Sequence, residues 1–186
     1  MEKVLGNMEE NQKDATLMRE NRTAILVTQT PEETRQIGCA LGKGLMGGEV
    51  IALIGDLGSG KTSFVQGLAL GLGIPPAEIT SPTFTIIHEH QGRLPLVHVD
   101  LYRLERLEAI EALGVVDYFD EERVAVIEWA ERAIPLLPSN VLYIRFIFLS
   151  SRERELHFEG RGGHYKDLVD PLIAKYKNYL GGEPDD

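Results

Sequence analysis

The residues best suited to chemistry lie in one short glycine-rich stretch. Residues 55–62 read G-D-L-G-S-G-K-T, which matches the P-loop pattern G-x-x-x-x-G-K-S/T at every fixed position. In such a loop the backbone N–H groups surround a phosphate, the lysine reaches the β- and γ-phosphates, and the last hydroxyl binds Mg²⁺. The sequence therefore predicts a nucleotide site. The residues expected to contact the nucleotide are Gly55, Asp56, Leu57, Gly58, Ser59, Gly60, Lys61, Thr62 and Ser63, with Thr62 also on the metal.

The segments on either side of this loop have the patterns that a P-loop requires. Residues 49–54 form a nearly pure apolar run, which is typical of a parallel strand buried on both faces. Residues 62–72 carry apolar side chains at helical spacing, and Gly73 follows as a C-terminal cap. An ordinary glycine-rich turn is the alternative, but a strand, a glycine-rich loop and a helix in this order favour a nucleotide site.

Two later predicted strands each end in an acid. Residues 96–101 read L-V-H-V-D-L and contain Asp100, and residues 123–129 read R-V-A-V-I-E-W and contain Glu128. A strand-end acid beside the P-loop strand faces the metal site in P-loop proteins, so we expect both acids there. Either acid could hold Mg²⁺ or orient the attacking water, and with Lys61 they are the candidate catalytic residues. A helix cap or a salt-bridge partner is the alternative role for each acid.

A loop stiffened by proline follows the predicted P-loop helix. Residues 80–84 read T-S-P-T-F. Many P-loop enzymes have a switch loop at this place, in which a threonine such as Thr83 senses Mg²⁺ and the γ-phosphate. A polar turn before a strand predicted at 84–89 explains the same residues, and spacing does not separate the two.

Three histidines could be imagined as a metal cluster, but the sequence argues against it. They are His88, His90 and His98, and no cysteine or further histidine completes a ligand set. His98 and Asp100 lie two apart in one predicted strand, so their side chains point to the same face.

Length and composition exclude several classes of protein. The 186 residues fit one domain, and a formal net charge of −10 argues against a direct nucleic-acid binder or a protein of anionic membranes. No apolar run reaches transmembrane length, and the N-terminus has no signal-peptide core. The single Cys39 cannot form an internal disulfide, so we expect a cytoplasmic location.

The remaining patterns complete a mainly parallel α/β sheet. We expect a three-layer P-loop sandwich with antiparallel strands at the sheet edge. The predicted organisation is a flexible N-terminal extension at 1–23, a P-loop domain at 24–160, and a C-terminal helix and tail at 161–186. Further predicted elements are an edge strand at 24–29, a helix from 31 to 46, a short helix at 130–137, an edge hairpin of strands 141–149 and 154–158, and a helix at 165–180.

Four motifs in this order resemble the TsaE (YjeE) family. They are G-D-L-G-S-G-K-T at 55–62, S-P-T-F at 81–84, H-V-D-L-Y-R-L at 98–104 and I-E-W at 127–129. The resemblance covers roughly residues 24–158. It implies that Lys61 and the loop amides hold the phosphates of ATP.

The resemblance also implies roles for residues outside the loop. Thr62 and Glu128 would bind Mg²⁺, and Asp100 would be a second essential acid near the nucleotide. Thr83 takes the switch-like position. The adenine side lies near residues 151–153, where Arg152 is the candidate contact.

The function that the resemblance implies is slow, Mg²⁺-dependent ATP hydrolysis stimulated by partners. The family helps to form N6-threonylcarbamoyladenosine at position 37 of tRNA together with the proteins TsaD and TsaB. The acidic charge agrees with a protein that does not itself bind tRNA.

Two other classes remain as alternatives. A small-molecule or nucleoside kinase would need a lid of arginines, and Arg93, Arg103 and Arg106 are few and scattered. A GTP-dependent switch would carry an N-K-x-D motif, and no such string occurs.

Overall fold

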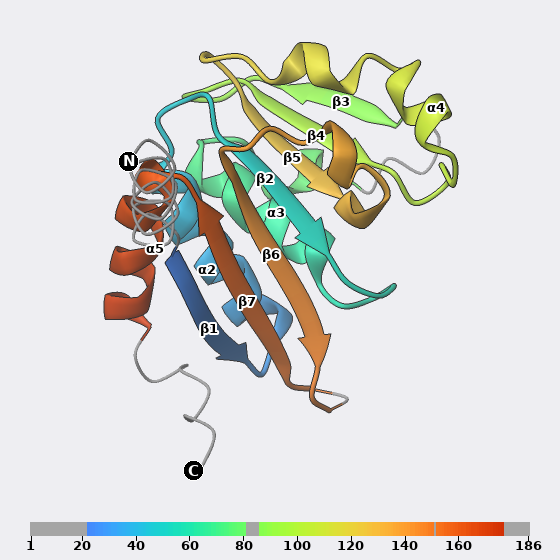
Figure 1. The fold of residues 1–186 in the computed structure, drawn as a ribbon. Helices are drawn as coiled ribbons and strands as arrows, with labels where there is room; N and C mark the ends of the chain where they lie inside the picture. Colours follow the sequence, from blue (N-terminus) through green and yellow to red (C-terminus); the bar gives the residue numbers. More distant parts are fainter. Residues whose placement is uncertain (1–21, 81–85, 151, 177–186) are drawn as a thin grey trace, which may run out of the picture.

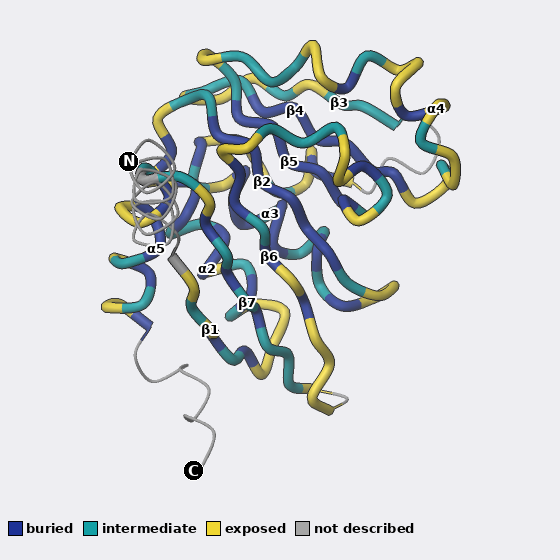
Figure 2. The backbone as a smooth tube through the Cα atoms, viewed as in Figure 1, coloured by how far each residue is buried: buried dark blue, intermediate teal, exposed yellow. Residues whose placement is uncertain are grey.

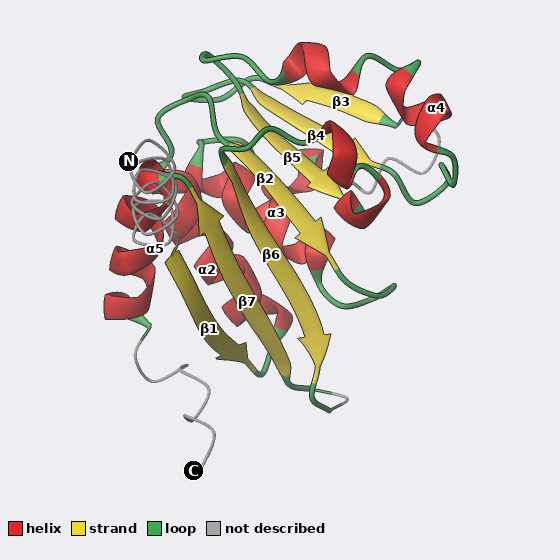
Figure 3. Cartoon of the chain, viewed as in Figure 1, coloured by secondary structure: helices red, strands yellow, loops and turns green. Residues whose placement is uncertain are grey.

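The fold is built on one seven-stranded sheet (Figure 1). The computed structural model describes residues 22–80, 86–150 and 152–176. The strands lie in the order β1-β7-β6-β2-β5-β4-β3 (Figure 3). Their bounds are β1 Arg22–Thr28, β2 Val50–Ile54, β3 Ile87–His90, β4 Leu96–Asp100, β5 Val124–Glu128, β6 Val141–Phe148 and β7 Arg154–Arg161.

The centre of the sheet is parallel and its outer pairings are antiparallel. The strands β6, β2, β5 and β4 pair in parallel in that order. In contrast, β7 is antiparallel to both β6 and β1, and β3 is antiparallel to β4. Every residue of β2, β4 and β5 is buried, because these apolar strands have a neighbour on each side and a layer on each face. The predicted α/β class, with its mainly parallel sheet, is confirmed.

Helices cover the two faces of the sheet unequally. On one face α2 (Pro31–Gly44), α3 (Lys61–Gly71) and α5 (Gly163–Lys175) bury one apolar cluster. On the other face the short α4 (Leu107–Glu111) and several 3-10 turns bury a second, smaller cluster. The 3-10 turns on this second face are η2 Val115–Tyr118, η3 Ala130–Arg132 and η4 Ile134–Leu136, whereas η1 Pro76–Glu78 contacts α3. Figure 2 shows the buried central strands between these layers.

Two predicted segments extend beyond the described residues. The N-terminal extension lies almost wholly in residues 1–21, and the end of the predicted 165–180 helix lies beyond Tyr176. Within the described ranges, no helix is long and apolar enough to cross a membrane.

The predicted hairpin forms, but its position at the sheet edge was wrong. β6 pairs with β7 on one side and with the P-loop strand β2 on the other, and β1 lies outside β7. The edge position predicted for the first strand is confirmed. An alternating pattern indicates one buried and one open face, but it does not identify the neighbouring strand.

The segment 130–137 was predicted as one short helix and instead forms the two 3-10 turns η3 and η4. Pro135 has no backbone N–H and disfavours the α conformation at Ile134. Pro135 therefore disfavours a continuous α-helix in this segment.

Glycines let α2 lie directly against the P-loop helix α3. A Cβ atom on Gly67 would overlap the carbonyl oxygen of Arg35, and one on Gly42 would overlap that of Leu68. Side chains at these positions would force the two helix backbones apart. The contact therefore fixes the position of α3, which begins at the P-loop lysine.

Substitution of Gly67 should test this contact. We expect Gly67→Ala to lower the free energy of unfolding by about 2 kcal/mol, because overpacking against backbone outweighs the helix propensity that alanine gains. Gly44→Ala is the matched control, since its Cβ would meet only the flexible Leu168 side chain. Urea denaturation of both variants gives the comparison, and equal stability of Gly67→Ala and wild type would contradict the packing argument.

Candidate functional site

The P-loop joins β2 to α3 at the carboxyl end of the parallel strands. Gly60 is the N-cap of α3 and has φ of +107°, a left-handed conformation that side chains rarely adopt. The helix then begins at Lys61, so the N–H groups of its first turn have no carbonyl partner within the helix. Such an end attracts anions through these donors and the helix dipole.

The Lys61 side chain is buried and folded over its own loop. Its Nζ donates to the carbonyl oxygens of Gly55, at 2.6 Å, and Asp56, at 2.9 Å. The same Nζ lies 4.0 Å from the centre of the Trp129 ring, a cation–π contact. Burial lowers the pKa of Lys61, and the nearby carboxylates, Glu128 first among them, oppose this shift.

Thr62 and Glu128 meet across the pocket. The Thr62 Oγ1 lies 3.0 Å from each carboxylate oxygen of Glu128. Glu128 is buried, with 2% of its surface exposed. A hydroxyl and a carboxylate at this place are suitable oxygen ligands for a divalent cation.

Asp100 lies at the same end of the sheet. It is the register partner of Glu128 in the β4–β5 pair, and its Oδ1 accepts from the N–H of Tyr102 at 2.9 Å. Of the two strands that end in an acid, however, only β5 lies directly beside the P-loop strand β2, so Glu128 takes the adjacent position and Asp100 the next one out.

The pocket formed by these residues fits a polyphosphate group with a cation. Its volume is about 210 Å³, and its lining includes Lys61 and the two acids Asp100 and Glu128. The buried Ser59 hydroxyl has no hydrogen-bond partner among the described residues, as expected for a group that awaits a ligand. The pocket is lined by Leu57, Gly58, Ser59, Gly60, Lys61, Thr62, Ser63, Asp100, Tyr102, Glu128 and Trp129.

One predicted contact lies elsewhere, and another is not described. Arg152 lines a separate pocket of about 320 Å³ with Gln29, Thr30, Ser150 and Glu153. Thr83 lies outside the described residues.

Sequence reasoning missed the contributions of His98 and Trp129. The sequence placed His98 on the face of Asp100 but indicated no role for it beyond the disfavoured metal cluster, and the described residues contain no group of three or more potential ligands of that kind. Instead its Nε2 lies 2.9 Å from Glu128 Oε1. The sequence feature that could have indicated this role is the position of His98 in an otherwise apolar strand, on the same face as Asp100.

Trp129 follows Glu128 and has φ of +59°, the only positive φ at a non-glycine among the described residues. This conformation turns its ring over Lys61 and against Tyr102, whose ring centre is 5.0 Å away. A strained backbone at such a place indicates a functional constraint. The sequence gives no signal for a positive φ at a tryptophan.

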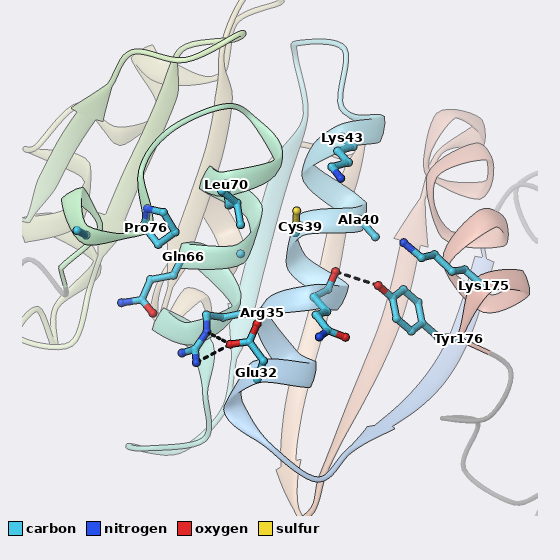
Figure 4. A pocket seen from close by; sticks show the side chains of 13 residues that line it. Glu32, Arg35, Cys39, Ala40, Lys43, Gln66, Leu70, Pro76, Lys175 and Tyr176 are labelled. Carbon is cyan, nitrogen blue, oxygen red and sulfur yellow. Dashed lines mark hydrogen bonds and ion pairs between the residues drawn. The ribbon is translucent and has the colours of Figure 1, made fainter.

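A larger pocket of about 660 Å³ lies among α2, α3 and α5 (Figure 4). Several of its polar groups are paired within the protein: Arg35 with Glu32 at 2.9 Å, and the Tyr176 hydroxyl with the carbonyl of Gln36 at 3.1 Å. None of the acids or the lysine of the P-loop pocket lines it, so the candidate chemistry remains at the P-loop.

Comparisons with known proteins agree on one family. The protein-family model described as threonylcarbamoyl adenosine biosynthesis protein TsaE matches residues 28–156 of this chain. A Bacillus subtilis protein named tRNA threonylcarbamoyladenosine biosynthesis protein TsaE is 42% identical over 146 residues, which cover 78% of this chain and 90% of the relative. The Treponema pallidum protein of the same name is 43% identical over 130 residues, with coverages of 70% and 96%.

A solved structure is similar over most of the fold. The crystal structure of Bacillus subtilis YdiB matches with a TM-score of 0.70 and 36% identity, covering 83% of this chain and 97% of that one.

The buried lysine should leave a signature in the pH dependence of stability. Its pKa in the folded protein lies below the ordinary value of 10.5, so between these two values the unfolded chain binds more protons. The stability of wild type relative to Lys61→Met should therefore rise as the pH increases toward 10.5. Urea denaturation across this range measures it, with Lys43→Met as an exposed-lysine control. A relative stability that falls with pH would show that the carboxylates outweigh burial.

Proposed function

The chain belongs to the TsaE family, and from this premise we propose that it binds ATP with Mg²⁺ and supports formation of N6-threonylcarbamoyladenosine at position 37 of tRNA. The observation that carries the proposal is the meeting of Thr62 with Glu128 beside the buried Lys61, at the N-terminus of α3. These groups are the charge and oxygen donors that a metal–triphosphate requires.

Each residue has a defined part in this proposal. Lys61 and the amides of 55–63 bind the phosphates, and Thr62 and Glu128 hold Mg²⁺. The metal supplies positive charge that offsets the charge of the phosphates. Asp100 orients the attacking water or accepts its proton, since its carboxylate lines the same pocket as Lys61.

We assign the adenine side to the pocket around Arg152. This pocket lies between the turn that follows β1 and the turn that precedes β7. Arg154, at the start of β7, packs within reach of Gly60, which connects this region to the P-loop. The Arg152 guanidinium could stack on the base.

We propose that the protein acts at the surface of partners, TsaD and TsaB. Two large apolar side chains of the pocket rim are exposed: Leu57, at 71%, and Tyr102, at 46%. Exposed apolar groups beside a nucleotide pocket suit a protein contact. The net charge of −10 opposes direct tRNA binding, and the proposed location is the cytoplasm.

A kinase function has less support. Arg93 donates to the carbonyls of Gly42 and Leu45, where it stabilises the end of α2, and Arg106 pairs with Glu108 at 3.6 Å on the surface. These arginines are therefore engaged away from the phosphate pocket, and hydrolysis fits the site better than transfer to an acceptor.

Loss of the lysine charge should weaken ATP binding. We expect Lys61→Ala to reduce Mg-ATP affinity roughly 10- to 100-fold, because a hydrogen bond to a charged group contributes about 1.5–3 kcal/mol. Isothermal calorimetry measures the affinity, with Lys43→Ala as the control. Equal affinities for wild type and a folded Lys61→Ala protein would reject the P-loop site.

Partners should accelerate hydrolysis. Phosphate release should be slow for the protein alone and faster with TsaD and TsaB together, since the exposed pocket rim is completed by the partner surface. Rates measured alone, with each partner and with both provide the test. A full rate without partners would favour a self-sufficient enzyme, and phosphate transfer to a nucleoside would favour a kinase.

A further inference from the structure

Glu128 is contacted by groups from two other elements. His98 of β4 approaches its Oε1 through Nε2 at 2.9 Å, and Thr62 of α3 approaches both oxygens at 3.0 Å. His98 is 0% exposed and Glu128 is 2% exposed. The contact is therefore shielded from water. In such a buried place a hydrogen bond is stronger than in water, and its loss costs more free energy.

The contact determines which nitrogen of His98 carries the proton. An ionised carboxylate only accepts hydrogen bonds, so Nε2 must donate to Glu128. The other ring nitrogen, Nδ1, is buried and has no partner among the described residues. An unpaired acceptor there is tolerated more readily than an unpaired N–H donor, so both ends of the ring favour the same tautomer.

Thr62 and His98 differ in which oxygen of Glu128 they contact. The Thr62 hydroxyl is equally far from the two oxygens of Glu128, so it does not distinguish them. The His98 contact is to Oε1. It therefore makes the two oxygens of the carboxylate inequivalent.

We propose that His98 is a positioning residue, which holds Oε1 of Glu128 so that Oε2 is presented to the metal. This inference rests on the proposed function, because it assigns Glu128 to the metal. A glutamate has three side-chain torsions, and the fixed imidazole removes that freedom before any ligand binds. In other proteins, loss of a side chain that hydrogen-bonds a metal ligand lowers metal affinity or activity by about 10- to 100-fold.

The tautomer can be observed without nucleotide. In long-range ¹H–¹⁵N spectra of the wild-type protein, His98 should show a protonated Nε2 and an unprotonated Nδ1. Glu128→Ala should make the Nε2 proton exchange faster or shift the tautomer equilibrium. An Nδ1-protonated ring in the wild type would overturn the inference.

Three substitutions of His98 separate hydrogen bonding from packing. His98→Leu removes both nitrogens, His98→Gln puts an amide near the place of Nε2, and His98→Asn puts one near the place of Nδ1. The affinity for Mn²⁺, used as the probe metal in the presence of ATP, should fall 10- to 100-fold in His98→Leu and His98→Asn. His98→Gln should recover most of it, and ATP affinity without metal should change less than about twofold in all three.

His88 is the cross-strand partner of His98 on the edge strand β3 and is only half-buried, so His88→Gln should leave Mn²⁺ affinity unchanged. Thermal unfolding establishes that each variant is folded. Unchanged Mn²⁺ affinity in folded His98→Leu would overturn the inference, as would equal losses in His98→Gln and His98→Leu, which indicate packing alone. A wild-type protein that binds neither ATP nor Mn²⁺ would instead overturn the proposed function and the inference with it.

Discussion

The candidate site depends on how one buried carboxylate is stabilised. Glu128 ends β5 at 2% exposure, and an ionised carboxylate there is costly unless it accepts hydrogen bonds. Among the described residues, its carboxylate contacts Thr62 of α3 and His98 of β4. The carboxylate therefore links the P-loop helix to the strands at its carboxyl end. The first turn of α3 and the acid that faces it are positioned by the same contacts.

The buried cation of the site is stabilised in a different way. Burial disfavours the charged form of Lys61 and so lowers its pKa. The ammonium group is stabilised by two carbonyl oxygens of its own loop and by the Trp129 ring. These are contacts that a phosphate could replace, since each is weaker than a bond to a full negative charge. The strained conformation of Trp129 is the local cost of placing the ring there.

The P-loop helix is fixed along its length as well as at its start. At its start Thr62 contacts Glu128, and further along Gly67 lets the backbone of α2 approach closely. Because both constraints act on one rigid helix, its N-terminal donors keep a defined position relative to the strand ends. Sites that bind phosphate through backbone groups need this rigidity, since the donors cannot adjust one by one.

The sequence by itself determined the P-loop, the buried parallel strands, the antiparallel outer pairings and the family. The P-loop follows from the fixed glycine and lysine spacing in 55–62, and the buried strands follow from the mainly apolar runs that end at Asp100 and Glu128. Only the tertiary structure decided that β6 lies beside β2, that His98 contacts Glu128, and that Trp129 covers Lys61. Strand order, register and a positive φ arise from contacts between distant segments, and no local pattern encodes which segments will meet.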